Sequence, residues 1–347
     1  MKNTICPLPW INLAQTSDNN IIVCSNNIIS TGGILQESTS TDFQNIRQEM
    51  INGVVPAHCK KCFAEEEKGL LSKRQGAINN YQNFDPKDAN PHDLKSIEVY
   101  SKFANTVEIG NVSSITFLEE NSLDIKEHYD FLIDIVATGK SKGISLIYNL
   151  SDCKGFNNKI INVWGQFKHV KFNLKLDTEE NKHDWLNPDT SYRYVMNILT
   201  FIKSVKANHV DVNITTRVNL LTVPYLDRLA SWKEHHNPFG VLNRMGEIIN
   251  LQMDDNVNLD IRRLPKHLKG YTKLKIERVL DKHRLDTLFN SNPNGRAAWQ
   301  GIIDYMYSED LSQNLPDTLN YLKEQDAKNN TNWREVFPEL TDIEDDL

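Results

Sequence analysis

Four cysteines in the first 62 residues constrain this sequence more than any other feature. The chain has 347 residues and 5 cysteines, and the four near its start follow the pattern C-x17-C-x34-C-x2-C. An odd number of cysteines and the lack of an apolar export signal argue against disulfides, because the cytosol keeps thiols reduced. The spacing instead predicts a metal or cluster site with the ligands Cys6, Cys24, Cys59 and Cys62.

The close pair Cys59 and Cys62 can reach one ion or cluster together, and the two distant cysteines would complete the ligand shell. Four thiolates suit Zn²⁺ and an iron–sulfur cluster equally well, so the spacing leaves both open. The intervening Lys60 and Lys61 would offset part of the thiolate charge and favour deprotonation. Two competing interpretations, small buried hydrophobic residues or a redox pair, explain the clustering less well.

The charge balance is moderately acidic, with 39 Lys and Arg residues, 46 Asp and Glu residues and a formal net charge of −7. Without a dense basic run, this balance makes a phosphate-tracking nucleic-acid partner a poor expectation. No apolar run approaches the roughly 20 residues of a membrane span, so we expect no membrane association and a cytoplasmic location. The length predicts about two domains.

Short apolar runs alternate with amphipathic helical patterns from about residue 96 onward, which is typical of an α/β fold with a parallel sheet or barrel. The candidate strands are residues 114–118, 143–150, 169–177 and 209–218. The candidate helices are residues 126–138, 157–167, 191–206 and 225–235. Ligands bind beyond the carboxyl ends of such strands, although a polar residue there more often forms a turn or caps a helix. The candidate contacts are Asn149, Asp152, Asp177 and Arg217.

Pattern and composition divide the sequence into four parts. These are a four-cysteine domain at residues 1–75, an Asn- and Pro-rich linker at 76–95, an α/β core at 96–260 and a helical region at 261–347. In the first part, one helix is expected to begin near Thr41 and to end before Gly53. A second helix is expected to carry the acidic residues 65–67 and the basic residues 73 and 74 on a solvated face.

Motifs of several common mechanisms are missing from the sequence. It contains no glycine-rich phosphate loop, no G-x-S-x-G and no H-E-x-x-H. The adjacent His235 and His236 are expected to cap a helix end or to lie on the surface rather than to bind metal. The fifth cysteine, Cys153, follows a predicted strand and is expected to be a buried thiol.

Several stretches of the sequence resemble the twitch domain of radical SAM proteins. They are Cys6-Pro-Leu-Pro-Trp10, Cys24, Ile46-Arg47, Met50-Ile-Asn-Gly53, Pro56-Ala-His-Cys59-Lys-Lys-Cys62, Glu65-Glu66 and Leu71-Ser-Lys-Arg74. Residues 147–150, 170–177 and 333–340 are similar to the later barrel strands and the C-terminal tail of that family. The resemblance implies a truncated (β/α) barrel of radical SAM type. It also implies that the four N-terminal cysteines hold an auxiliary [4Fe-4S] cluster, with zinc as the alternative.

The sequence departs from that family where SAM would bind. Radical SAM proteins chelate SAM to the open iron of a cluster held by C-x3-C-x2-C, and these 347 residues contain no such motif. Where the family has Gly-Gly-Glu-Pro, this sequence reads Glu119-Glu-Asn-Ser122. Cys153 cannot hold a cubane alone, because such a cluster needs several thiolates. SAM is therefore not an expected cofactor.

These observations predict a degenerate radical SAM and twitch protein that binds an auxiliary cluster without cleaving SAM itself. Its expected role is peptide or partner binding, or electron relay. One alternative is a modifying enzyme that works with a partner supplying the SAM cluster. Another is a structural zinc module, in which four thiolates contribute folding energy and no redox chemistry.

Overall fold

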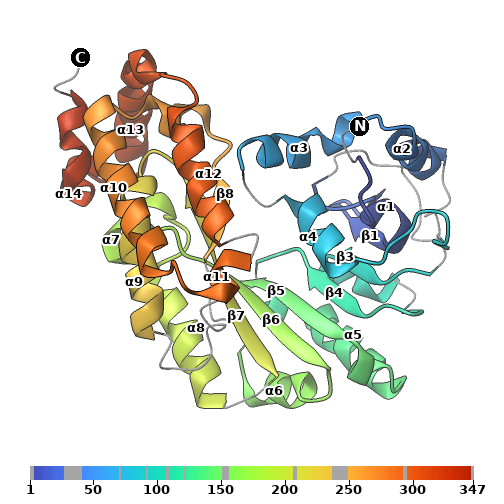
Figure 1. Ribbon diagram of the computed structural model, residues 1–347. Helices are drawn as coiled ribbons and strands as arrows, with labels where there is room; N and C mark the ends of the chain where they lie inside the picture. Colours follow the sequence, from blue (N-terminus) through green and yellow to red (C-terminus); the bar gives the residue numbers. More distant parts are fainter. Residues whose placement is uncertain are drawn as a thin grey trace. The chain divides into compact units, whose positions relative to one another are not determined.

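The computed structural model of the chain describes residues 4–26, 41–69, 72–90, 93–106, 109–120, 122–150, 156–205, 209–236, 249–291 and 295–344. The chain divides into two compact units. Unit 1 comprises Met1–Glu66, Ser72–Asn173 and Val205–Asp211, and unit 2 comprises Glu67–Leu71, Leu174–Ser204 and Val212–Leu347. Among the described residues, eight strands form a sheet in the order β2-β1-β3-β4-β5-β6-β7-β8, so the fold is α/β (Figure 1).

Unit 1 contains the N-terminal elements and the first strand and helix alternation. It begins with α1 (Leu8–Ile11), β1 (Asn12–Gln15), β2 (Ile21–Ile22) and α2 (Thr41–Ile51), and continues with the 3-10 turn η1 (Ala57–Cys59), α3 (Lys60–Glu67) and α4 (Lys73–Asn80). The alternation consists of β3 (Ser96–Val99), β4 (Ser114–Phe117), α5 (Lys126–Ala137), β5 (Ser145–Leu150) and α6 (Asn158–Trp164).

Two strands, β6 (His169–Lys175) and β7 (Val210–Val218), begin in unit 1 and end in unit 2. The other elements of unit 2 are α7 (Glu180–Leu186), α8 (Tyr192–Val205), α9 (Leu226–His236), β8 (Asn250–Met253), α10 (Lys266–Lys282), α11 (Thr287–Ser291), α12 (Arg296–Tyr307), α13 (Leu315–Asn329) and α14 (Trp333–Val336). The last residue of α8 belongs to unit 1.

The strand register of unit 1 lines up apolar residues across the sheet. Strand β1 pairs with β2 in antiparallel and with β3 in parallel orientation, and β3, β4 and β5 continue in parallel. Leu13 lies opposite Ile97, Ile97 opposite Ile115, and Ile115 opposite Leu146. All four side chains are almost completely buried. This row excludes water from the centre of unit 1 and contributes to its stability through apolar burial.

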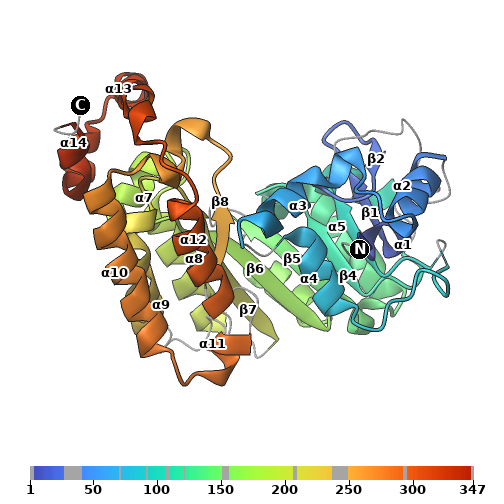
Figure 2. The same cartoon turned by 45° about the horizontal axis from the view of Figure 1, so that its top comes forward.

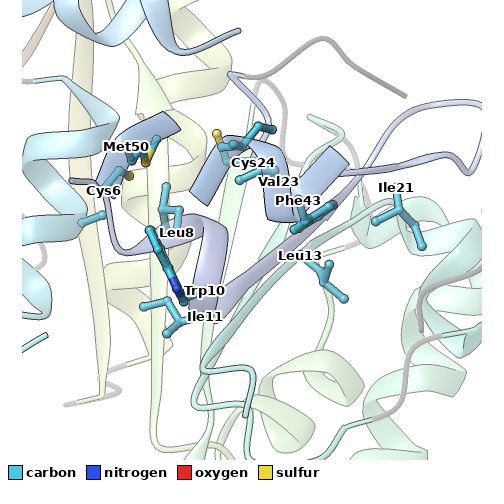
Figure 3. Packing of buried hydrophobic residues seen from close by; sticks show 12 residues of the cluster. Cys6, Leu8, Trp10, Ile11, Leu13, Ile21, Val23, Cys24, Phe43 and Met50 are labelled. Atoms are coloured by element: carbon cyan, nitrogen blue, oxygen red, sulfur yellow. The ribbon is translucent and has the colours of Figure 1, made fainter. Parts of the chain in front are cut away.

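A second apolar cluster joins the N-terminal segment to α2 (Figure 3). Trp10 packs against Phe84 with ring centroids 5.5 Å apart. Phe43 and Met50 project from α2 into the same cluster, each with 1% of its surface exposed. The apolar residues of α2 at helical spacing therefore face the N-terminal strand rather than solvent, as helix periodicity predicts.

In unit 2, α10 packs against α9 and α12 (Figure 2). The backbone of Gly69 lies directly against Gly301 in α12: a methyl group built on Gly301 would be 2.8 Å from the carbonyl oxygen of Gly69. Only glycine allows two backbones to approach so closely. Trp299 of α12 and Trp333 of α14 are fully buried.

The predicted α/β class is confirmed, and the four predicted strands of the core correspond to β4, β5, β6 and β7. The expected helix at Thr41 is α2. The second N-terminal helix was expected to be continuous, which is wrong: α3 ends at Glu67, and α4 starts after a capping box formed by Ser72 and Gln75. The predicted division at residues 75, 95 and 260 stays a prediction. Among the described residues, no helix combines the length and apolar character needed to cross a membrane.

Candidate metal centre

The structure brings the four N-terminal cysteines into one part of unit 1. Cys6 precedes α1, Cys24 follows β2, Cys59 ends η1, and Cys62 lies in α3. Cys6, Cys24 and Cys62 are buried, Cys59 is half-buried, and all four are free thiols. Cys6 and Cys24 belong to the apolar cluster of Figure 3, and Cys59 packs against it.

The pKa values of Cys6 and Cys59 reflect their burial and the charges of the neighbouring cysteines. Burial raises the pKa of Cys6, and the neighbouring Cys24, Cys59 and Cys62 raise it further. Burial raises the pKa of Cys59 to about 12, with additional contributions from Cys24 and Cys62. Cys6 and Cys59 would therefore resist ionisation without a compensating cation, as expected for sulfur in an apolar environment.

Local contacts fix the segment that carries Cys6. The hydroxyl of Thr4 donates to the carbonyl oxygen of Met50 at 2.6 Å, and Nε of Arg47 donates to the carbonyl oxygen of Pro9 at 2.8 Å. The guanidinium of Arg47 also lies 5.9 Å from the ring centroid of Trp10. These bonds hold the N-terminal segment against α2, because both ends of each bond are buried.

Three hydrogen-bond donors point at sulfur atoms of this group. The backbone N–H of Leu8 donates to Cys6, and that of Asn26 donates to Cys24. The side-chain amide of Asn26 donates to Sγ of Cys62 over 3.8 Å. Donors of this kind stabilise negative charge on sulfur and, in iron–sulfur proteins, influence the reduction potential.

Two cations that were not expected from the sequence act on the thiols. Burial raises the pKa of Cys24 to about 11, while the charge of Lys73 opposes this shift. Arg74 has the same opposing effect on Cys59. Lys60 and Lys61, which flank Cys59 directly, are exposed to solvent. Both acting cations stand in the first turn of α4, so the capping box of Ser72 sets their position.

Acidic partners hold the two cations in place. Nζ of Lys73 forms an ion pair of 2.5 Å with Glu98 of β3, whose other carboxylate oxygen accepts from Asn12 at 2.9 Å. Arg74 pairs with Glu66 of α3 through both Nε and Nη2. Glu98 was not a candidate residue, because a charged residue inside a short strand pattern gives no signal of burial.

The residues around the thiols fit an iron–sulfur cluster or zinc in the chemistry of the donor set. Four thiols, three donors to sulfur and two nearby cations provide the ligands and the charge compensation that either would need. Within the part of the chain that the structure describes, no three His, Cys, Asp or Glu side chains are arranged to hold a single metal ion. The four thiols share one region without surrounding one point.

The strand-end candidates fall into different places. In unit 1, Asn149 donates to the carbonyl oxygen of Phe117 at 3.1 Å and accepts from Asn173 at 3.1 Å, so it links neighbouring strands. In unit 2, Asp177 is completely buried and accepts from the backbone N–H, Nε and Nη2 of Arg217. Burial opposes ionisation of Asp177, but Arg217 outweighs it and holds the pKa of that carboxyl below its ordinary value.

Other sequence candidates have simpler outcomes. Asp152 and Cys153 lie outside the described residues. His235 is exposed near the end of α9, where its Nδ1 lies 2.6 Å from the carbonyl oxygen of Ser231, in agreement with the surface role predicted for it.

Comparisons with known proteins add no family to this description. No model of a known protein family matches the chain, and no curated protein matches it. The resemblance to the twitch domain therefore stays a prediction that depends on the residues quoted for it.

Proposed function

We propose that the chain is a degenerate radical SAM-like protein whose unit 1 binds an auxiliary [4Fe-4S] cluster through Cys6, Cys24, Cys59 and Cys62. The observation that carries this proposal is that these thiols share one region of unit 1, where Cys6 lies within electrostatic reach of the other three. Thiols buried only for packing need no donors to sulfur and no nearby cations, yet this group has both.

The residues of unit 1 have distinct roles in this proposal. Lys73 and Arg74 compensate part of the charge of four thiolates, and Glu98 and Glu66 hold these cations in position. Asn26 stabilises charge on sulfur through its backbone and side-chain N–H groups. When bound, such a cluster supplies one-electron transfer.

The rest of the chain supports a radical SAM-like scaffold without SAM cleavage. Strands β3 to β8 lie in the sheet in sequence order, and the pairs β3–β4, β4–β5 and β7–β8 are parallel, which is compatible with a partial (β/α) barrel. The sequence contains no C-x3-C-x2-C motif. These residues therefore do not provide the three-cysteine cluster whose open iron would chelate SAM. We therefore assign the protein to electron relay or to the binding of a peptide or protein partner.

A cysteine series tests the ligand set. The double variant Cys59→Ser/Cys62→Ser and the control Cys153→Ser are purified without oxygen, and iron, acid-labile sulfide and zinc are measured in each. We expect iron and sulfide to be lost from the double variant and retained in the control. Iron retained by the double variant, or stoichiometric zinc in place of iron in the unmodified chain, would contradict the proposal.

Incubation with SAM and a strong reductant tests the second part. The anaerobically purified protein, alone, is expected to form no 5′-deoxyadenosine above the background of the double cysteine variant. Formation of this product in proportion to the protein concentration would show that the chain cleaves SAM and would refute its assignment as a non-cleaving protein.

A further inference from the structure

A small polar pocket lies in unit 2, at the carboxyl ends of β7 and β8. Its volume is about 100 Å³. A cavity of roughly 150 Å³ can bind one benzene molecule, so this pocket suits a ligand of only a few non-hydrogen atoms. A nucleotide or a large cofactor is too big for this space. Parallel sheets bind ligands at this end of their strands, so the position itself favours a binding role.

One wall of the pocket carries a positive charge in a fixed position. Nε and Nη2 of Arg217 bond Asp177, and Nη2 also donates to Leu186 and Asn187. Within the described residues, Nη1 has no hydrogen-bond partner. Asp177 is completely buried, so it locks the guanidinium while leaving one donor edge for a ligand.

The next strand places a negative charge near this guanidinium. The carboxylate of Asp254 accepts from Nδ2 of Asn219 at 2.8 Å and from the backbone N–H of Asn256 at 3.0 Å. Asp254 also contributes to the raised pKa of Arg217, so the two charges lie within electrostatic reach. Each carboxylate oxygen has a further lone pair, which leaves room for a ligand donor.

Helix α13 completes the pocket with a polar stripe. Tyr321, Gln325 and Asn329 are spaced four residues apart, so they share one face of the helix and line the cavity. The side chains of Gln325 and Asn329 make no hydrogen bond to any residue that the structure describes. Trp185 lines another side, held by a bond of 2.9 Å from its Nε1 to Asp326.

We propose that this pocket binds a small free α-amino acid. Its carboxylate would accept from Nη1 of Arg217, and its ammonium group would donate to Asp254. The amides of α13 would take the remaining hydrogen bonds, while Trp185 and Leu259 provide apolar wall for a short side chain. A zwitterion can use both the remaining donor of Arg217 and the remaining acceptor capacity of Asp254, whereas a ligand of one sign can use only one of the two. This proposal does not depend on the cluster of unit 1.

Calorimetric titration of the full chain with glycine, L-alanine and L-serine tests the proposal. Acetate and methylammonium serve as ligands with one charge each, and glycerol serves as a neutral polar ligand. We expect saturable binding of at least one amino acid, about ten-fold tighter than either singly charged ligand. No saturable binding of any amino acid, or equal binding of glycerol, would overturn the proposal.

Two variants and a control connect the affinity to the pocket. Asp254→Asn is expected to weaken amino-acid binding by about ten-fold. Gln325→Ala, on the surface of α13, is expected to weaken amino-acid binding several-fold. This variant keeps the test valid if Asp254→Asn does not fold. Asn320→Ala removes an exposed amide of the same helix outside the pocket and should leave affinity unchanged. Unchanged affinity in both pocket variants would place the binding elsewhere and reject this site.

Discussion

At the scale of single residues, a buried ion pair holds two helices of unit 1 together. Arg74 and Glu66 form a bidentate ion pair whose side chains are only 10% and 13% exposed. The guanidinium also donates to the carbonyl oxygen of Ile5 at 3.1 Å and lies 4.4 Å from the ring centroid of Phe63. The prediction of a solvated acidic and basic face was wrong for Glu66 and Arg74. A sequence pattern does not show which helices pack against each other in the folded chain.

Removing one partner of this pair should destabilise unit 1. The substitution Arg74→Ala leaves the largely buried carboxylate of Glu66 without its cationic partner. We therefore expect a loss of about 3 kcal/mol in the free energy of unfolding. Urea denaturation followed by circular dichroism measures this loss. Lys87→Ala, at an exposed position, should change stability by less than about 0.5 kcal/mol. A loss in Arg74→Ala no larger than in this control would contradict the structure.

His128 predicts a pH dependence of stability. Burial lowers its pKa to about 3, and its Nε2 lies 3.0 Å from the hydroxyl of Tyr148. The unfolded chain binds a proton at His128 below about pH 6.5, while the folded chain does not until about pH 3. Stability from this group is therefore complete above pH 6.5 and falls as the pH drops toward 3.

The variant His128→Phe removes this titration and retains an aromatic ring. Between pH 6 and 4, its unfolding free energy should depend on pH less steeply than that of the unmodified chain, by up to about 1.4 kcal/mol per pH unit. Urea denaturation at several pH values provides the two slopes. Equal slopes would mean that His128 titrates normally in the folded chain.

At the scale of elements, long periodic segments could be predicted from the sequence and short polar ones could not. The apolar alternation of β5, β6 and β7 indicates strands because one face of each is buried. Strand β3 has only four residues, and its Glu98 is buried through partners from β1 and α4 that are distant in sequence. Helix α7 is short and mostly polar, so its periodicity is too weak to recognise.

The surroundings of two helical glycines predict opposite effects on stability when each is replaced by alanine. Gly301→Ala places a methyl group 2.8 Å from the carbonyl oxygen of Gly69, so we expect a loss of roughly 1 to 3 kcal/mol in stability. Gly270→Ala in α10 meets no atom within 4 Å and should stabilise the helix by up to about 1 kcal/mol. Thermal denaturation ranks the two variants, and stabilisation by Gly301→Ala would contradict the close approach.

At the scale of the whole molecule, the sequence predicted the four cysteines of the candidate centre but not the residues around them. Cys6, Cys24, Cys59 and Cys62 were recognisable because clustered cysteines are a chemical signal. Asn26, Lys73 and Glu98 come close to the thiols only through the tertiary folding of loops and helix ends. The local sequence around each residue does not predict that folding. The same holds for the pocket of unit 2, whose walls come from strand ends and α13.

The most direct test of the central claim is the iron and acid-labile sulfide content of the anaerobically purified protein. The account predicts about four iron and four sulfide per chain, as a [4Fe-4S] cluster requires. Stoichiometric zinc without sulfide, or neither metal after reconstitution with iron and sulfide, would contradict the assignment of the four cysteines to an iron–sulfur cluster.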